Sequence, residues 1–165
     1  MAKEFGVDEV LEVAERMERN AVKFYRKAAG LCDDPKISRL FIDLARWERQ
    51  HARVFTDMRD RLPGPNWQPG RYVLDLDDRF PTESPLPLVF SDNEYPLNGL
   101  VGGPTKAEVL RTAIQKEKDT ITYYMGLKEF ILGHHNIQVV KAVIREENQH
   151  VRILMQSLEQ IPERR

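Results

Sequence analysis

The sequence predicts an all-α fold: a four-helix bundle of two antiparallel helical hairpins joined by a long crossover. Four segments repeat their apolar residues with helical period, the connection within each pair of segments is short, and residues 63–104 separate the two pairs. Short connections favour antiparallel neighbours, whereas a long one lets the chain return along the bundle. We expect the whole chain, 1–165, to form a single domain.

The first hairpin is predicted from two segments, about 7–30 and about 35–62, in which apolar residues recur every three or four positions. The start of the second segment is well marked. Asp34 is a good N-cap, and Pro35 suits the first helical position because its missing N–H would have no helical partner there. The turn of this hairpin is therefore expected just before Asp34.

The second hairpin is predicted from segments at about 106–132 and about 136–161. Thr105 and Glu108 form a capping-box pattern in which each side chain satisfies a backbone N–H of the other. The start of the last helix is left open among three residues, Gly133, His134 and Asn136.

The crossover, residues 63–104, holds most of the chain's ten prolines and nine glycines. It is too long for an ordinary helix-to-helix loop. A short strand at "RYVLDL", residues 71–76, is one interpretation, and an irregular segment along the bundle is the other. We expect the crossover to make the second helix parallel to the third, with the two halves related by an approximate two-fold.

A carboxylate and an imidazole interrupt the apolar face of the second helix. That face is predicted to run through Leu44, Glu48, His51 and Phe55. Burying such groups is expensive unless they are paired or bound to a metal ion. Their partners must therefore come from elsewhere in the chain.

An internal repeat supplies these partners. Shifting the sequence by 99 residues places the first half over the second and gives each half a glutamate followed, 30 residues later, by a Glu-x-x-His motif. Residues equidistant from a hairpin turn lie at one height, and residues i and i+3 share a helix face. The candidate metal ligands are Glu18, Glu48, His51, Glu117, Glu147 and His150.

Four carboxylates in a dry core would repel one another and take up protons, whereas two divalent cations would neutralise them. Four glutamates with two histidines are the ligand set of di-iron carboxylate bundles. We therefore expect two metal ions, with iron preferred and zinc or manganese as alternatives. The competing interpretation is a duplicated bundle whose buried polar groups pair with the repeat's arginines, Arg46, Arg53, Arg145 and Arg152.

The chain resembles rubrerythrin-type proteins of the ferritin-like superfamily. "MERNAVKFYRKAA" is similar to the family's first-helix pattern, "ERQH" and "ENQH" match its Glu-x-x-His motifs, and "EKDTITYY" matches its third-helix glutamate. The resemblance covers the four helices but not residues 63–104. It departs in two features. Cys32 is the only cysteine, so the cysteine pairs of a rubredoxin domain are missing, and Thr120 stands where rubrerythrins proper carry a further glutamate.

The resemblance implies a ferritin-like four-helix bundle and an oxidoreductase that reduces hydrogen peroxide or dioxygen with electrons from an external donor. It also implies that Tyr25 and Tyr124, at matching positions of the repeat, reach ligand carboxylates with their hydroxyls. Core packing alone is the alternative for these tyrosines. The alternative functions are a ferroxidase supplying an iron store, a zinc-holding bundle without activity, and a di-iron hydroxylase.

Charge and hydropathy limit the remaining possibilities. A net charge of -1 gives no case for nucleic-acid binding, and no apolar run approaches the length of a membrane span. The N-terminus shows no apolar signal-peptide core, so we expect a cytoplasmic protein, and a homodimer. Glu146 is expected off the core face. His134 and His135 are expected in a solvated turn.

Overall fold

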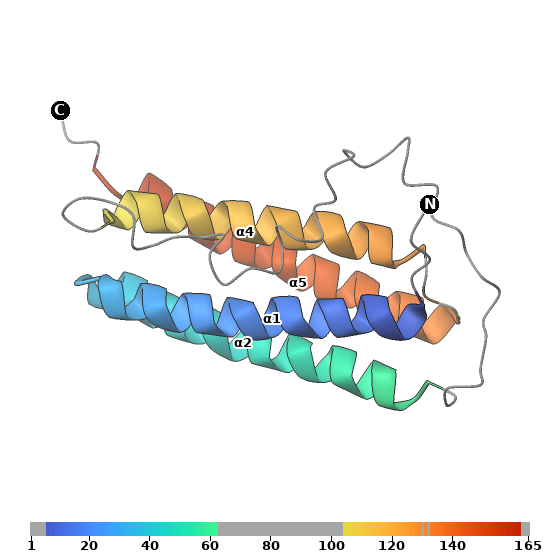
Figure 1. Cartoon of the computed structure of the whole chain (residues 1–165). Helices are drawn as coiled ribbons and strands as arrows, with labels where there is room; N and C mark the ends of the chain where they lie inside the picture. The colour runs from blue at the N-terminus through green and yellow to red at the C-terminus, as the bar shows by residue number, and fades with distance from the viewer. Residues whose placement is uncertain (1–5, 63–103, 130, 132, 163–165) are drawn as a thin grey trace, which may run out of the picture.

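The structure, a computed structural model, describes residues 6–62, 104–129, 131 and 133–162. The predictions for 63–103, including the strand at 71–76, lie outside these residues. The described helices are α1 (Val7–Leu31), α2 (Pro35–Asp60), α4 (Lys106–Leu127) and α5 (His134–Glu159) (Figure 1).

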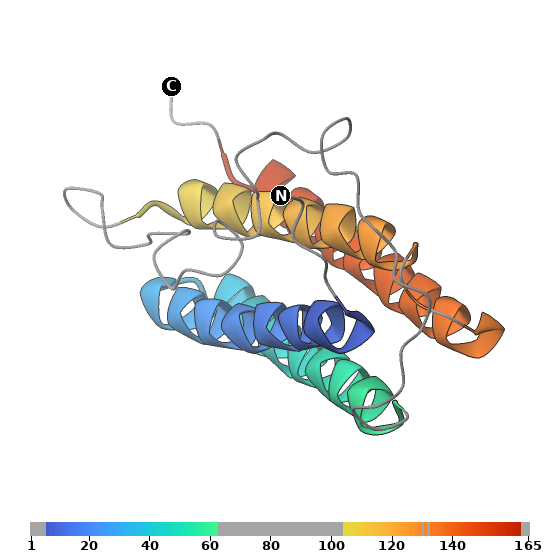
Figure 2. The ribbon, with the colours of Figure 1, turned by 45° about the vertical axis from the view of Figure 1, so that its right-hand side comes forward.

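The four helices are arranged as the two predicted hairpins. α1 packs against α2 and α4 packs against α5, while α1 also contacts α4 and α2 contacts α5. Helices α2 and α4 run in the same direction, and the two views in Figures 1 and 2 agree on this arrangement. The predicted bundle with a parallel second and third helix is therefore confirmed, and an approximate two-fold relates the hairpins.

The N-termini of α2 and α4 are capped by the side chains that the sequence predicts. The Asp34 side chain accepts hydrogen bonds from the backbone N–H groups of Lys36, at 3.0 Å, and Ile37, at 3.4 Å. In the capping box, the backbone N–H of Glu108 donates to the Thr105 hydroxyl and the backbone N–H of Thr105 donates to the Glu108 carboxylate. These side chains satisfy N–H groups that lack a partner in the first helical turn.

The second hairpin turn differs from the prediction. α4 ends at Leu127 and not near 132, because the weak helix former Gly126 precedes a tight turn in which Glu129 N–H donates to the Gly126 carbonyl. α5 begins at His134, with Gly133 as its N-cap at a φ of 89°, a conformation that favours glycine. His134 and His135 thus form the first turn of α5 and are exposed, not part of a loop.

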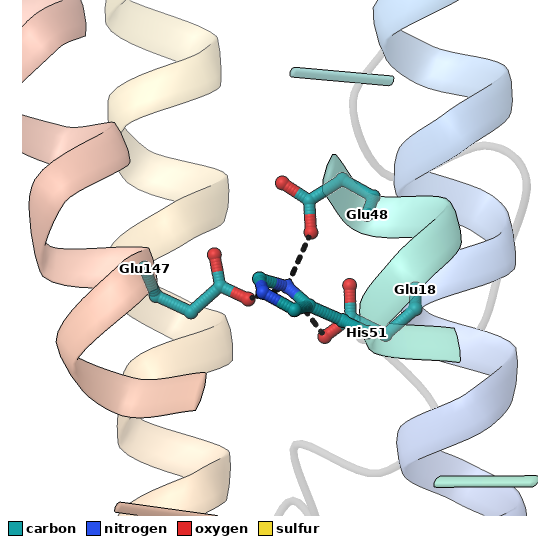
Figure 3. A group of neighbouring side chains, drawn as sticks. All are labelled: Glu18, Glu48, His51 and Glu147. Atoms are coloured by element: carbon teal, nitrogen blue, oxygen red, sulfur yellow. Dashed lines mark hydrogen bonds and ion pairs between the residues drawn. The ribbon is translucent and has the colours of Figure 1, made fainter. Parts of the chain in front are cut away.

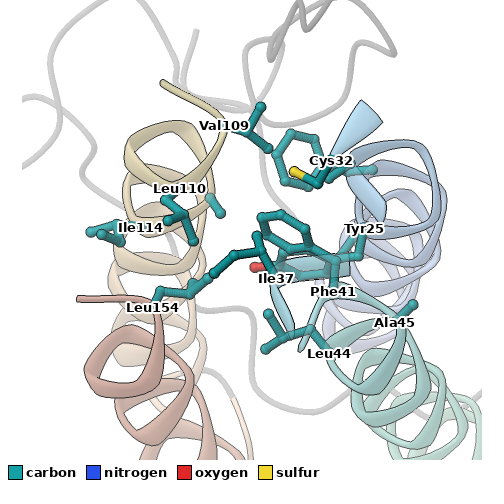
Figure 4. Packing of buried hydrophobic residues seen from close by; sticks show 14 residues of the cluster. Tyr25, Cys32, Ile37, Phe41, Leu44, Ala45, Val109, Leu110, Ile114 and Leu154 are labelled. Carbon is teal, nitrogen blue, oxygen red and sulfur yellow. The ribbon is translucent and has the colours of Figure 1, made fainter. Parts of the chain in front are cut away.

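Two apolar clusters fill the bundle on either side of its middle. One surrounds Phe41, whose ring stacks on Tyr25 with centroids 5.9 Å apart (Figure 4). The other surrounds Phe55, whose ring lies 5.0 Å from that of Tyr124. Along α1 and α2 the clusters leave a gap of about two turns between them. That gap is the level of the candidate metal ligands.

We expect Phe41→Ala to lower the free energy of unfolding by about 3–5 kcal/mol, since it removes a fully buried ring and leaves a cavity beside Tyr25. Urea unfolding followed by circular dichroism measures the loss. The matched control is Ile42→Ala on the same helix, where the side chain is 44% exposed, and its effect should stay within about 1 kcal/mol. Equal losses in the two variants would contradict this description of the core.

Candidate metal centre

A layer of charged side chains crosses the middle of the bundle between the two apolar clusters. All six candidate ligands lie in this layer, and none is more than 4% exposed. Glu18 comes from α1, Glu48 and His51 from α2, Glu117 from α4, and the last pair from α5. The structure therefore brings together every side chain that the repeat singled out.

The six side chains form two overlapping groups. In each group, one ligand atom from every residue lies within 4.8 Å of the others. The first group contains Glu18, Glu48, His51 and Glu147, and Figure 3 shows Glu147 reaching toward His51 from the opposite hairpin. The second contains Glu48, Glu117, Glu147 and His150. Two carboxylates, Glu48 and Glu147, are thus common to both groups.

Each histidine turns its Nδ1 atom toward both shared carboxylates. His51 Nδ1 lies 3.2 Å from Glu48 Oε2 and 2.8 Å from Glu147 Oε1. His150 Nδ1 lies 2.8 Å from Glu147 Oε2 and 3.1 Å from Glu48 Oε1. The two imidazole rings are 5.7 Å apart. The arrangement follows the approximate two-fold of the repeat.

The shared carboxylates are incompletely satisfied by protein groups. Among the described residues, Glu48 Oε1 and Glu147 Oε1 are buried and accept no hydrogen bond, although each lies within ion-pair distance of a histidine Nδ1. A single Nδ1–H can donate to only one of the two carboxylates that it faces, so the nearby oxygen of the other carboxylate accepts no hydrogen bond from it. An unsatisfied buried acceptor costs about 1–3 kcal/mol. A divalent cation between the carboxylates would remove that cost, so the donor set fits a metal ion.

Burial sets the pKa values of the outer carboxyl groups. Burial raises the pKa of Glu18 well above its usual range, and the charges of Glu147 and Glu48 raise it further. Burial, followed by the charges of Glu48 and Glu147, does the same for Glu117. Without metal these two groups therefore favour their protonated form.

The shared carboxylates and the histidines behave in the opposite way. Burial alone would raise the pKa of Glu48 and of Glu147, but close contacts with His150 and His51 hold both below the usual range. Burial alone would lower the histidine pKa values, yet close contacts with Glu147 and Glu48 raise the pKa of His51 far above its usual value and that of His150 to about 10. Protonated histidines thus take the place of cations in the metal-free layer.

Two tyrosines tie the hairpins together at this level. The Tyr25 hydroxyl on α1 donates to Glu117 on α4, and the Tyr124 hydroxyl on α4 donates to Glu18 on α1. Both side chains are fully buried. Each tyrosine therefore reaches a carboxylate of the opposite hairpin, as the family resemblance implies. Their part in any chemistry stays a prediction.

Sequence reasoning missed two neighbours of the histidines. Glu146 Oε2 lies 2.9 Å from His51 Nε2 even though the Glu146 side chain is 61% exposed. The Trp47 ring stacks on His150, with centroids 5.2 Å apart and planes 12° from parallel. Glu146 does lie off the buried face, as expected, but it still contacts the centre. The repeat offers a signal, because Trp47 and Glu146 occupy equivalent positions immediately before a candidate ligand.

The alternative pairing with arginines does not describe the layer. Arg46 pairs with Asp43 on its own helix, 3.4 Å away. The contacts described above join the six buried groups to one another, to Tyr25 and Tyr124, to Glu146 and to Trp47, and none of these contacts involves an arginine. Thr120, at the position of the missing carboxylate, is buried on α4.

Residues 6–66 match the family model described as Rubrerythrin. A crystal structure of a proposed ferritin-like diiron-carboxylate protein from Thermotoga maritima matches with a TM-score of 0.67 and 27% identity, covering 97% of this chain and 99% of that one. No curated protein matches the sequence. Within the described part of the chain, no helix has the length and apolar character that crossing a membrane demands.

The electrostatics predict that the metal-free protein loses stability as the pH rises from 7 to 9. The folded state keeps a proton on His150 up to a pKa of about 10, whereas the unfolded chain releases it near pH 6.5. Stability from this raised pKa is complete below pH 6.5 and is lost toward pH 10. The lowered pKa values of Glu48 and Glu147 act only in acid, outside this window.

We expect the free energy of unfolding to fall by up to about 5 kcal/mol between pH 7 and pH 9, because each retained proton contributes at most about 1.4 kcal/mol per pH unit and both His150 and His51 retain one. The raised pKa values of Glu18 and Glu117 act in the same direction. Urea unfolding in the presence of a chelator measures this fall. His134→Gln, which changes an exposed histidine, should show the same fall. A metal-free protein of constant or increasing stability over this range would refute the proton arrangement.

Proposed function

We propose that this ferritin-like protein of the rubrerythrin type binds two metal ions, iron by preference, and reduces hydrogen peroxide or dioxygen with electrons from an external donor. The observation that carries the proposal is the pair of overlapping four-residue groups with Glu48 and Glu147 in common. Two such groups in one buried layer suit two ions held close together.

The ligand assignment follows from membership of the groups. Glu18 and His51 belong to the first group alone and would hold one ion, while Glu117 and His150 belong to the second alone and would hold the other. Glu48 and Glu147 would serve both. Four glutamates offset the charge of two divalent cations, and each ion would receive one imidazole nitrogen.

The donor set favours a redox metal over a structural one. Structural zinc sites are closed tetrahedra rich in cysteine and histidine, whereas mixed carboxylate and imidazole ligands suit iron. When bound, two ferrous ions supply two electrons, and these with two protons convert one hydrogen peroxide into two water molecules. A donor must then return two electrons before the next turnover. The relative described as a diiron-carboxylate protein supports this choice of metal.

The chain's own residues would hold the terminal ligands and exclude water. Tyr25 and Tyr124 fix the carboxylates of Glu117 and Glu18 from the opposite hairpin. Burial raises the pKa of both tyrosines well above their usual value, and the neighbouring carboxylates raise it further. They therefore stay protonated and keep donating. Thr120 leaves a neutral group where the related proteins carry another carboxylate.

Two other expectations from the sequence stay predictions. The homodimer is tested by native mass spectrometry, and the cytoplasmic location by fractionation of cells that make the protein. An external electron donor is likewise proposed, and the chain holds only one cysteine from which an internal redox cluster could be built.

The first test is the metal content. After anaerobic loading with Fe(II) and removal of excess metal, we expect two iron atoms per chain by elemental analysis. Glu18→Ala and Glu117→Ala should each lower the ratio toward one, because each removes a ligand of a single group. Glu159→Ala, at the exposed end of α5, is the charge-matched control. A folded wild-type protein that binds no metal would defeat the proposal.

The second test is the reaction itself. In stopped-flow mixing, we expect the iron(II)-loaded protein to be oxidised faster by hydrogen peroxide than by dioxygen, since peroxide takes up the two electrons of one turnover. His51→Ala and His150→Ala should slow oxidation more than Tyr25→Phe, because they remove a proposed ligand. Faster reaction with dioxygen and growth of a ferric mineral would instead support a ferroxidase. If the protein as isolated holds zinc tightly and its iron-loaded form reacts with neither oxidant, the proposal that it is an enzyme fails.

A further inference from the structure

The repeat is broken at one pair of positions beside the histidines. A shift of 99 residues places Trp47 of α2 over Glu146 of α5. Each of these residues reaches the histidine of the opposite hairpin: Glu146 contacts His51, and Trp47 contacts His150. The two ends of the layer share a glutamate, a histidine and a tyrosine, and they differ at one further position, where buried Lys116 precedes Glu117 and Met17 precedes Glu18.

At the first end, Glu146 has the geometry of a proton acceptor for the histidine. His51 Nδ1 faces the shared carboxylates, and Nε2 lies 2.9 Å from Glu146 Oε2. When Nδ1 serves as a ligand, the ring proton must lie on Nε2, from which it can be donated to Glu146. Such a contact fixes the tautomer and orientation of a ligating histidine and increases its basicity.

At the second end, an indole occupies the equivalent place. The Trp47 ring covers one face of the His150 ring, almost parallel to it. The indole of tryptophan has an N–H donor but no atom that accepts a hydrogen bond from an imidazole N–H. Trp47 can therefore exclude water and restrict the tilt of the ring, but it cannot select the tautomer as a carboxylate does.

Building on the proposed metal centre, we propose that Glu146 and Trp47 make its two halves unequal, so that the half with Glu18 and His51 binds its ion more tightly. Both are positioning residues that act through a histidine. Loss of a hydrogen-bonded partner of a ligating histidine costs about ten- to hundredfold in metal affinity. Because Glu146 is 61% exposed, we expect about tenfold, the low end of this range.

Zinc provides a test that needs no activity, because it is not oxidised or reduced. Metal-free protein labelled with ¹⁵N-histidine is titrated with up to one equivalent of Zn(II), and the ring nitrogens are followed by NMR. The ring signals are assigned with His51→Gln and His150→Gln. We expect zinc to bind His51 first, with a ratio of bound His51 to bound His150 of about ten at low zinc occupancy, and this ratio should fall as the two sites fill toward one equivalent.

The variants exchange the two environments. Glu146→Gln should bring the ratio down toward one, and Trp47→Glu should do so by supplying the second half with its own carboxylate. Trp47→Phe keeps an aromatic ring and should keep the wild-type ratio. Glu159→Gln, on the exposed end of α5, controls for the loss of charge on this helix. Circular dichroism checks that each variant is folded.

The outcomes separate this inference from the proposed function. Equal filling of the two histidines in the wild type, or an unchanged ratio in folded Glu146→Gln, would overturn the inference and leave the two-metal centre standing. If neither histidine responded to zinc, the proposed centre would fail and the inference with it.

Discussion

The burial of four glutamates in one layer of the core is the constraint on which the rest of the structure depends. Four ionised carboxylates at this level would repel one another without solvent to screen them. The metal-free chain relieves the repulsion with protons, which stay on Glu18 and Glu117 and on both histidines. Two divalent cations would relieve the repulsion more completely, because they would also bind the oxygens of Glu48 and Glu147 that accept no hydrogen bond.

The architecture serves this layer. The two apolar clusters close it from both ends, and the tyrosine hydroxyls join the hairpins across it. Parallel α2 and α4 (Figure 1) allow the hairpins to be related by an approximate two-fold, so each hairpin contributes two glutamates and one histidine to the layer. Direct packing is closest within each hairpin. The two apolar clusters pack residues of both hairpins together, and the charged and hydroxyl side chains of the layer add contacts between the hairpins, which gives a bound metal a part in holding them together.

The sequence predicted the layer because two independent patterns coincide in it. Helical period placed Glu48 and His51 on a buried face, and the repeat predicted the same for Glu147 and His150, so one motif supported the other. Neither pattern predicted that Glu48 and Glu147 would belong to both groups, since this depends on how the hairpins meet. Glu146 was missed for the same reason: its contact with His51 crosses between hairpins, and periodicity along one helix reports only burial. α4 ends earlier than predicted because the weak helix former Gly126 is followed by a tight turn, and the spacing of apolar residues does not predict such a turn.

The central claim is that two metal ions lie close together in this layer and share Glu48 and Glu147. X-ray absorption fine structure of the anaerobically iron-loaded protein tests it most directly, because it measures the distance between metal atoms without an assay of activity. We expect a metal–metal shell at about 3.5–4 Å, the separation typical of two-metal sites. A spectrum with only light-atom shells around isolated iron atoms, in protein that contains two irons per chain, would contradict the account.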